Sequence, residues 1–122
     1  MVEGTRIRVL VVDDEFSIVE SLREILLWEG YEVDTAPNGR LALEAVARAR
    51  PSLILLDVMM PVMDGPTMLR ALRANADTAD IPVVLMSAAP LRSTPDALGY
   101  QAALRKPFEA LALLKTIRAL VA

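Results

Sequence analysis

The 122-residue chain contains no histidine and no cysteine. Without cysteine it has no disulfides, thiol nucleophiles or thiolate metal sites, and without histidine it cannot use Ser-His-Asp or Cys-His catalysis. Carboxylates, hydroxyls, amines and guanidinium groups remain. A metal ion bound by such groups would be a hard, oxygen-liganded cation such as Mg²⁺.

The chain also has little net charge and no long apolar run. Its 13 Lys and Arg against 16 Asp and Glu give a net charge of −3, which argues against general nucleic-acid binding. No apolar run approaches the roughly 18–20 residues that cross a bilayer, and charged residues interrupt the start of the chain where a signal peptide would have its apolar core. We expect a cytoplasmic protein that binds neither nucleic acid nor membrane directly, folded as a single domain over residues 1–122.

Short apolar runs alternate with helical patterns along the chain. Strands are predicted at Ile7–Val12, Tyr31–Ala36, Leu53–Leu56, Pro82–Met86 and Ala102–Arg105, and helices at Glu15–Trp28, between the cap Asn38 and Pro51, at Pro66–Asn75 and from Pro107 onward. Strands buried on both faces are continuously apolar, so the third and fourth strands are predicted to be central and the alternating second strand to lie near an edge. The order of elements predicts a doubly wound α/β fold, a five-stranded parallel sheet with helices on both faces.

The segment Ala88–Tyr100, between the last two strands, is the least regular. Pro90 and Gly99 leave room for about one helical turn, which Thr94 would cap with Pro95 at its first position. The fourth helix is therefore predicted to be short.

Polar residues end four of the five predicted strands: Asp13 and Asp14, Asp57, Ser87 and Lys106. In an open parallel sheet, ligands bind beyond the carboxyl ends of the strands. Three converging carboxylates need a cation among them, so we predict Mg²⁺, for which Mn²⁺ is a substitute, with Lys106 nearby. Such a site suits phosphoryl transfer, and a carboxylate can serve as its nucleophile, giving an aspartyl phosphate.

Each of these five residues also has a purely structural interpretation. The paired aspartates could cap a helix, the third could begin a turn, the serine could simply end a strand, and the lysine could be exposed. Their occurrence together at corresponding strand ends favours the functional interpretation. Asp64-Gly65 is interpreted as turn and helix-start chemistry alone.

The sequence resembles the receiver domain of response regulators in two-component signalling. The motifs that carry the resemblance are VLVVDDE at Val9–Glu15, LILLDVMMPVMDG at Leu53–Gly65, VVLMSA at Val83–Ala88 and LRKPF at Leu104–Phe108. They occur in the family's order and cover the whole chain. The resemblance implies the flavodoxin-like strand order 2-1-3-4-5.

The resemblance also implies roles for the acidic residues. Asp57 would accept a phosphoryl group from the phosphohistidine of a sensor histidine kinase or histidine phosphotransfer protein. Asp14, Asp57 and the backbone carbonyl of Met59 would ligate Mg²⁺, and Asp13 would act mainly through bound water. The chain would be a signalling phosphoacceptor rather than an enzyme, acting on a downstream protein or an attached output domain.

The remaining polar residues would contact the phosphoryl group. Lys106 would pair with one of its oxygens and Ser87 would hydrogen-bond another, with a cis peptide bond expected between Lys106 and Pro107. The resemblance also allows a phosphorylation-dependent dimer.

Two features depart from the family pattern. Ala103 occupies the position of a switching aromatic residue, and the nearest aromatic residue, Tyr100, lies three residues upstream. The interval between Ser87 and Lys106 is short, in line with a short fourth helix, so an unusual output surface is expected. A separate expectation concerns the lifetime of the phosphorylated state: the resemblance implies that Met59 and Ala89 flank the hydrolytic water, and because neither side chain can hydrogen-bond it, slow autodephosphorylation is predicted.

Two other functions fit the same fold class. A receiver-like interaction module would act without phosphorylation, but it has no need for converging acids. A flavodoxin-like flavin binder needs a hydroxyl- and glycine-rich phosphate loop after the first strand, where Asp13-Asp14-Glu15 would repel a phosphate.

Overall fold

The computed structural model describes residues 6–91 and 98–121, which form a three-layer α/β fold around one parallel sheet. The strands are β1 (Arg8–Val12), β2 (Glu32–Ala36), β3 (Leu53–Asp57), β4 (Val83–Ser87) and β5 (Ala102–Arg105); the helices are α1 (Phe16–Trp28), α2 (Gly39–Arg48), α3 (Gly65–Ala74) and α5 (Ala110–Val121). The strand order is β2-β1-β3-β4-β5, which confirms the predicted fold and topology. The predicted cap of the fourth helix at Thr94 and Pro95 lies outside the described residues.

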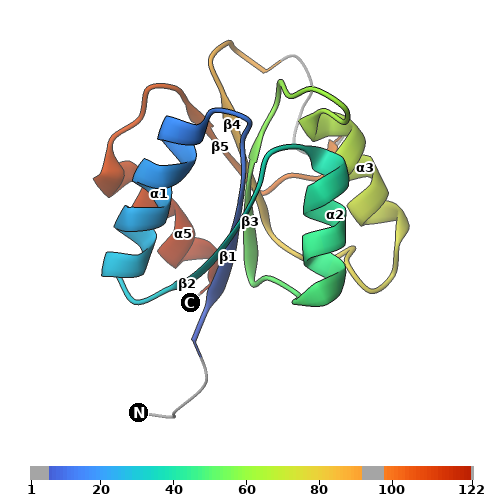
Figure 1. Ribbon diagram of the computed structural model, residues 1–122, viewed down its shortest axis with the longest axis horizontal. Helices are drawn as coiled ribbons and strands as arrows, with labels where there is room; N and C mark the ends of the chain where they lie inside the picture. Colours follow the sequence, from blue (N-terminus) through green and yellow to red (C-terminus); the bar gives the residue numbers. More distant parts are fainter. Residues whose placement is uncertain (1–5, 92–97, 122) are drawn as a thin grey trace.

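The helices cover both faces of the sheet, α1 and α5 one face and α2 and α3 the other (Figure 1). Successive residues of a strand point to opposite faces. In β3, Ile54 and Leu56 accordingly join the core under α2 and α3, while Leu53 and Leu55 join the core under α1 and α5. All residues of β3 and β4 are buried, as their continuous apolarity predicts.

Two helices begin at side-chain caps. Asn38 Oδ1 accepts the backbone N–H of Leu41 at 2.9 Å at the start of α2, which confirms this predicted cap. Asp64 Oδ1 accepts the N–H of Thr67 at 2.9 Å at the start of α3. Each cap satisfies an N–H group that the first helical turn leaves unpaired.

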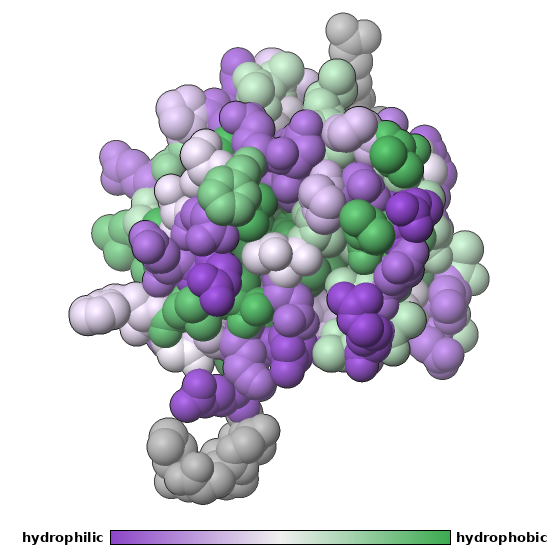
Figure 2. All heavy atoms as spheres, viewed as in Figure 1, coloured by the Kyte–Doolittle hydropathy of each residue, from purple (hydrophilic) through white to green (hydrophobic). Residues whose placement is uncertain are grey.

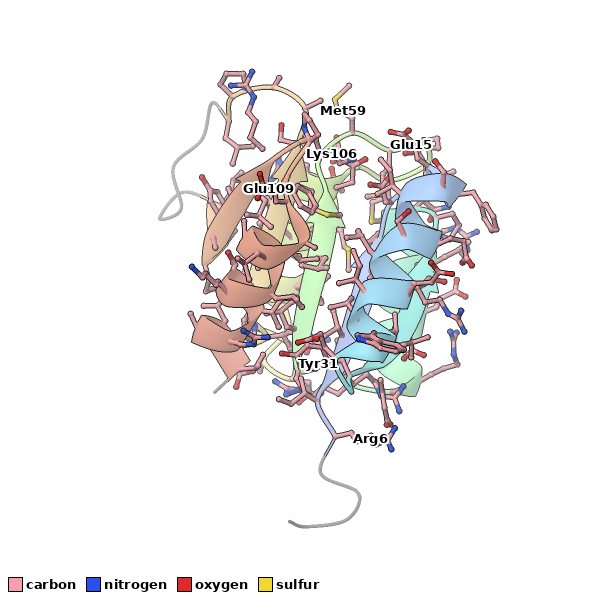
Figure 3. All side chains as sticks on the ribbon, turned by 90° about the vertical axis from the view of Figure 1, so that its left-hand side faces the viewer. Arg6, Glu15, Tyr31, Met59, Lys106 and Glu109 are labelled. Carbon is pink, nitrogen blue, oxygen red and sulfur yellow. The ribbon has the colours of Figure 1, made fainter. Side chains whose placement is uncertain are left out.

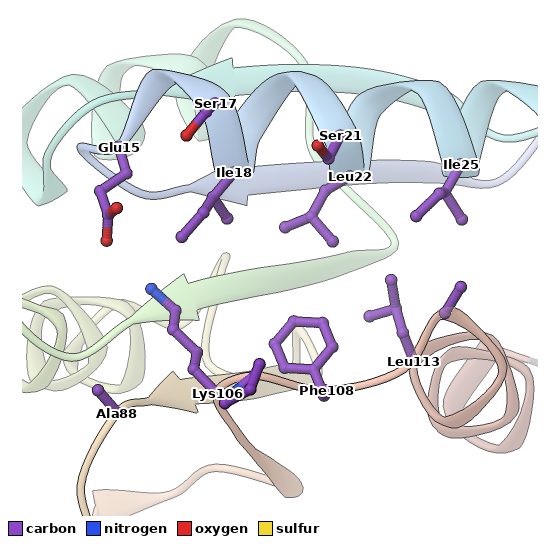
Figure 4. Close-up of a pocket in the computed structure, with 12 residues that line it drawn as sticks. Glu15, Ser17, Ile18, Ser21, Leu22, Ile25, Ala88, Lys106, Phe108 and Leu113 are labelled. Atoms are coloured by element: carbon purple, nitrogen blue, oxygen red, sulfur yellow. The ribbon is translucent and has the colours of Figure 1, made fainter.

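The predicted start of the last helix at Pro107 is wrong, because α5 begins at Ala110. The half-buried side chain of Phe108 packs against the core under α1 and α5, and in Figure 4 its ring lies on the side of Leu22 of α1. The chain therefore runs from the end of β5 toward α1 before it turns into the helix. Its first helical hydrogen bond joins the N–H of Leu113 to the carbonyl of Glu109.

The surface is more polar than the core. On the face seen in Figure 2, hydrophobic residues lie in separate small groups among hydrophilic ones. Within the described part of the chain, no helix combines the length and the apolar character that crossing a membrane requires.

Candidate functional site

The polar strand ends meet at one end of the sheet. Asp57 and Ser87 are the last residues of β3 and β4, and Lys106 follows β5 directly. Figure 3 shows Lys106, Met59 and Glu15 together at this end, with Tyr31 at the opposite end of the molecule. The parallel sheet thus gathers residues that are far apart in the sequence.

Three aspartates form an acidic cluster here. Asp13, Asp14 and Asp57 each offer a carboxylate oxygen, and these oxygens lie within 4.8 Å of one another. Asp13 and Asp57 are buried, with 1% and 6% of their surface exposed, while Asp14 is exposed. An oxygen donor set of this kind fits a hard divalent cation.

Lys106 is the cation of the cluster. Its Nζ donates to Asp13 Oδ2 at 2.8 Å and to Asp57 Oδ1 at 3.1 Å. Burial disfavours a charged lysine, but the hydrogen bonds to Asp13 and Asp57 outweigh it and raise the pKa of Lys106. The Lys106-Pro107 peptide bond is cis, as expected.

One lysine does not neutralise the three carboxylates. Burial, followed by the charge of Asp13, raises the pKa of Asp57 despite the hydrogen bond from Lys106. With all four side chains ionised, their formal charge is −3 + 1 = −2, counted from Asp13, Asp14, Asp57 and Lys106. A divalent cation would balance that charge.

The three aspartates differ in the hydrogen bonds that their carboxylates accept. Asp13 uses both carboxylate oxygens inside the protein, since Oδ2 accepts from Lys106 and Oδ1 accepts the N–H of Glu15 at 3.0 Å. The interpretation of Asp13 as a helix cap is wrong, because the N-cap of α1 is Glu15, which has no side-chain cap hydrogen bond, and the backbone N–H that Asp13 accepts precedes the helix. The geometry favours Asp14 and Asp57 as the residues that could bind a metal ion directly.

Ser87 is buried and bonded to its own loop. Its Oγ donates to the carbonyl of Ala89 and accepts the N–H of Ala89 at 3.2 Å. Its backbone carbonyl accepts the N–H of Lys106 at 2.8 Å. The hydroxyl must leave the Ala89 carbonyl before it can donate to a bound group.

All the predicted residues except Asp13 line one cavity of about 590 Å³, which includes Asp14, Asp57, Met59, Ser87 and Lys106. Met59 lies at its rim, with 78% of its surface exposed. The cavity therefore has Asp57 in its lining and the exposed Met59 at its rim.

Gly65 is a site residue that sequence reasoning missed. A Cβ there would overlap with the carbonyl oxygen of Asp57 and lie 3.0 Å from Cα of Val58. The N–H of Gly65 donates to the carbonyl of Val58 at 3.0 Å. Gly65 therefore lets α3 begin directly against the backbone of Asp57. The signal in the sequence was the glycine itself, because glycine is unusual as the first residue after a helix cap and can indicate a close backbone approach.

The loop after Asp57 contains a strained turn. The N–H of Met63 donates to the carbonyl of Pro61 at 2.7 Å across Val62, whose φ is +69°. This is a γ-turn of the rare positive-φ kind. The carbonyl of Met63 accepts the N–H of Gly39 at 3.0 Å, so the loop is also tied to the start of α2.

The residues that depart from the family pattern lie on and beside β5. Ala103 is exposed on this edge strand, whereas Tyr100 is buried in the core under α2 and α3. Tyr100 is therefore a core residue. Position 103, where the resemblance implies a switching aromatic side chain, carries only the methyl group of Ala103.

Comparison with known proteins agrees with this geometry. The sequence pattern of the "Response regulator receiver domain" family matches residues 9–118. The chain is similar to response regulator MprA of Mycolicibacterium vanbaalenii, with 42% identity over 118 residues, and to that of Mycobacterium leprae, with 44% over 117 residues. These alignments cover 94% and 93% of this chain but 50% of each relative, so the chain spans about half the length of the curated relatives it matches.

Solved structures show the same fold. Chemotaxis protein CheY4 of Vibrio cholerae superposes with a TM-score of 0.89 at 34% identity, covering 95% of this chain and 99% of that one. The receiver domain of sensor histidine kinase PA1611 from Pseudomonas aeruginosa has a TM-score of 0.87 at 25% identity, covering 96% and 98%, and that structure has a magnesium ion coordinated in its active site cleft. The chain therefore belongs to the response regulator receiver domain family.

Proposed function

We propose that this receiver domain is a signalling switch that accepts a phosphoryl group on Asp57 from a phosphohistidine, in the presence of Mg²⁺. The observation that carries the proposal is the meeting of Asp57 with two further aspartates, Lys106 and Ser87 at the carboxyl end of the sheet. A module that only binds other proteins has no need to bury carboxylates against one another, because their repulsion opposes folding.

The transfer exchanges one phosphorus bond for another. A carboxylate oxygen of Asp57 attacks phosphorus, the P–O bond forms, and the P–N bond to the donor histidine breaks. The imidazole leaves with the bonding electron pair and is protonated by water. The histidine belongs to the donor, a sensor histidine kinase or a histidine phosphotransfer protein, since this chain has none.

Asp14 and Asp57, with the backbone carbonyl of Met59, would bind Mg²⁺, and the same oxygen donors suit Mn²⁺. Asp13 would contribute through bound water, because its own oxygens are already bonded to Lys106 and Glu15. When bound, the metal ion neutralises negative charge on the phosphoryl oxygens.

Lys106 and Ser87 would bind the phosphoryl group after transfer. The ammonium of Lys106 already lies 3.1 Å from Asp57 and can pair with a phosphoryl oxygen there. The hydroxyl of Ser87 would exchange the Ala89 carbonyl for a second phosphoryl oxygen. That exchange would move the loop after β4 and so change the surface offered to a downstream protein or an attached output domain.

The phosphorylated state should be long-lived. Met59 and Ala89 flank the cavity with side chains that offer no useful hydrogen bond to an attacking water. We expect slow autodephosphorylation and no enzymatic turnover of another substrate. Measuring phosphate loss from the purified phosphoprotein in Mg²⁺ tests this, and a half-life of seconds would contradict it.

Beryllofluoride, a mimic of the phosphoryl group, tests the site without a kinase. Wild-type protein should bind it in the presence of Mg²⁺, with NMR shifts at Asp57, Ser87 and Lys106. Asp57→Asn should not bind it. Binding by the variant, or none by the wild type, would contradict the proposed function.

A further inference from the structure

Arg73, at the end of α3 that lies away from Asp57, joins this helix to two other segments of the chain. Its Nε donates to the carbonyl of Gly99 at 2.8 Å, its Nη1 to the carbonyl of Ala79 at 3.1 Å, and its Nη2 to Gln101 Oε1 at 3.2 Å. The side chain is half-buried, and within residues 6–91 and 98–121 it forms no salt bridge. Its N–H groups therefore donate to neutral oxygens, two on the chain that leads into β5, at Gly99 and Gln101, and two at Thr78 and Ala79.

Gly99 is shaped to lie against this side chain. Its φ is +80°, a conformation that favours glycine, and a Cβ there would come within 3.1 Å of Arg73 Nε and 3.3 Å of Arg73 Cγ. The backbone of Gly99 thus packs directly on the arginine as well as accepting its hydrogen bond. Both the hydrogen bond and the close packing therefore hold Gly99 against Arg73.

Gln101 extends the connection into the sheet. Its Oε1 also accepts the N–H of Val83 at 2.7 Å, and its own N–H donates to the carbonyl of Val83 at 2.9 Å. The glutamine side chain therefore completes the hydrogen bonding where β4 begins. Arg73 orients that side chain by donating to the same oxygen.

β5 depends on such contacts more than the other strands do. It is a four-residue edge strand, it pairs with β4 alone, and its residues alternate between half-buried and exposed. At its far end the N–H of Lys106 donates to the carbonyl of Ser87. The position of β5 along β4 therefore determines where the Lys106 ammonium lies.

We propose that Arg73 is a positioning residue for Lys106. By fixing Gly99 and Gln101 it sets the register of β5 on β4, and that register places the ammonium between Asp13 and Asp57. The inference rests on the proposed function, because Lys106 matters for phosphoryl binding there. It adds a residue of α3, outside the cavity, to the residues on which phosphoryl binding depends.

The test separates metal binding from phosphoryl binding. Arg73→Met removes the donors and keeps a long side chain, while Arg70→Met is the matched control, an exposed arginine on the same helix. Mg²⁺ affinity of Arg73→Met should not fall, because the carboxylates come from β1 and β3. Beryllofluoride affinity in saturating Mg²⁺ should fall about tenfold, since small misplacements of a binding group weaken its interaction steeply. Arg70→Met should match the wild type in both titrations.

A second variant tests the same path from its other end. Gln101→Ala leaves Arg73 in place but removes the acceptor that orients β5, and it carries the test if Arg73→Met fails to fold. Beryllofluoride affinity equal to the wild type, or an equal loss of Mg²⁺ and beryllofluoride affinity, would overturn the inference. Failure of the wild type itself to bind beryllofluoride would instead overturn the proposed function, and the inference with it.

Discussion

The ammonium of Lys106 lies 2.8 Å from a carboxylate oxygen of Asp13, so the end of β5 is bonded to the end of β1. Asp57 shares the same ammonium at 3.1 Å, and one lysine thus serves two buried acids. The charge repulsion among the three carboxylates is therefore only partly offset. The same negative charge that would attract a metal ion therefore lowers the free energy of unfolding of this receiver domain.

Asp57→Asn should raise the stability of the metal-free protein at neutral pH. Burial and the charge of Asp13 raise the pKa of Asp57, so the folded protein binds this proton more tightly than the unfolded chain does. Above the folded pKa the ionised carboxylate opposes folding, and a neutral amide removes that cost. Thermal unfolding in EDTA should give a Tm a few degrees higher than the wild type.

The control for this change is Asp77→Asn, an exposed aspartate away from the site, which should leave the Tm unchanged. Added Mg²⁺ should stabilise the wild type more than Asp57→Asn. A lower Tm for Asp57→Asn in EDTA would show that the hydrogen bond to Lys106 outweighs the cost of burying the charged carboxylate beside Asp13.

Asp64 should affect the free energy of unfolding in the opposite way to Asp57, because its pKa is lowered in the folded protein. The hydrogen bonds from Thr67 lower the pKa of Asp64, so its stabilising contribution is complete above the usual value of 3.8 and is lost as the pH falls through the lower folded pKa. Asp64→Asn keeps a capping oxygen and removes the charge. Because Asp64 is exposed and screened, we expect a cost of about 0.5 kcal/mol at neutral pH that disappears in acid.

Urea unfolding of both proteins across this pH range measures the Asp64 effect. A difference between wild type and Asp64→Asn that grows as the pH falls would contradict the assignment.

Gly65→Ala should cost about 1–3 kcal/mol of unfolding free energy, because the new Cβ overlaps with the Asp57 carbonyl and the backbone must shift. That shift also displaces Asp57, so beryllofluoride binding should weaken. Gly30→Ala is the control, since Gly30 has a φ of +91° but no atom within 4 Å of an added Cβ. It should lose stability and keep beryllofluoride affinity, and the same loss of affinity in both variants would refute the close-packing argument.

Val62→Gly should stabilise the fold by about 0.5–1 kcal/mol. A left-handed backbone costs a β-branched residue roughly 1–2 kcal/mol, which glycine does not incur. Glycine also raises the entropy of the unfolded chain, and this offsets part of the stabilisation. Little packing is lost, because 76% of Val62 is exposed. Val62→Ala retains a Cβ and the strain, so chemical denaturation should show a smaller gain for it; an equal gain would point to the valine side chain rather than the backbone.

The fold and the meeting of the site residues were predictable because both follow from simple periodicities. Continuous apolarity placed β3 and β4 at the centre, and the parallel arrangement then brings Asp13, Asp57 and Lys106 to one edge. These rules need no knowledge of individual contacts.

The remaining features depend on tertiary contacts between residues far apart in the sequence. The rule that favours proline at a helix start is local, whereas Phe108 must first reach the core beside α1, and α5 therefore begins later. The need for glycine at Gly65 arises from the backbone of Asp57 beside it, and Arg73 bonds to residues up to 28 positions away. No pattern within a short window reports such contacts.

The central claim is that Asp57 accepts a phosphoryl group with the help of a divalent cation. Incubation with acetyl phosphate and Mg²⁺, followed by intact mass measurement and peptide mapping, tests it most directly. The wild type should gain one phosphoryl group on the peptide that contains Asp57, and neither Asp57→Asn nor the wild type in EDTA should gain it. No adduct on the wild type, or an equal adduct on Asp57→Asn, would contradict the account.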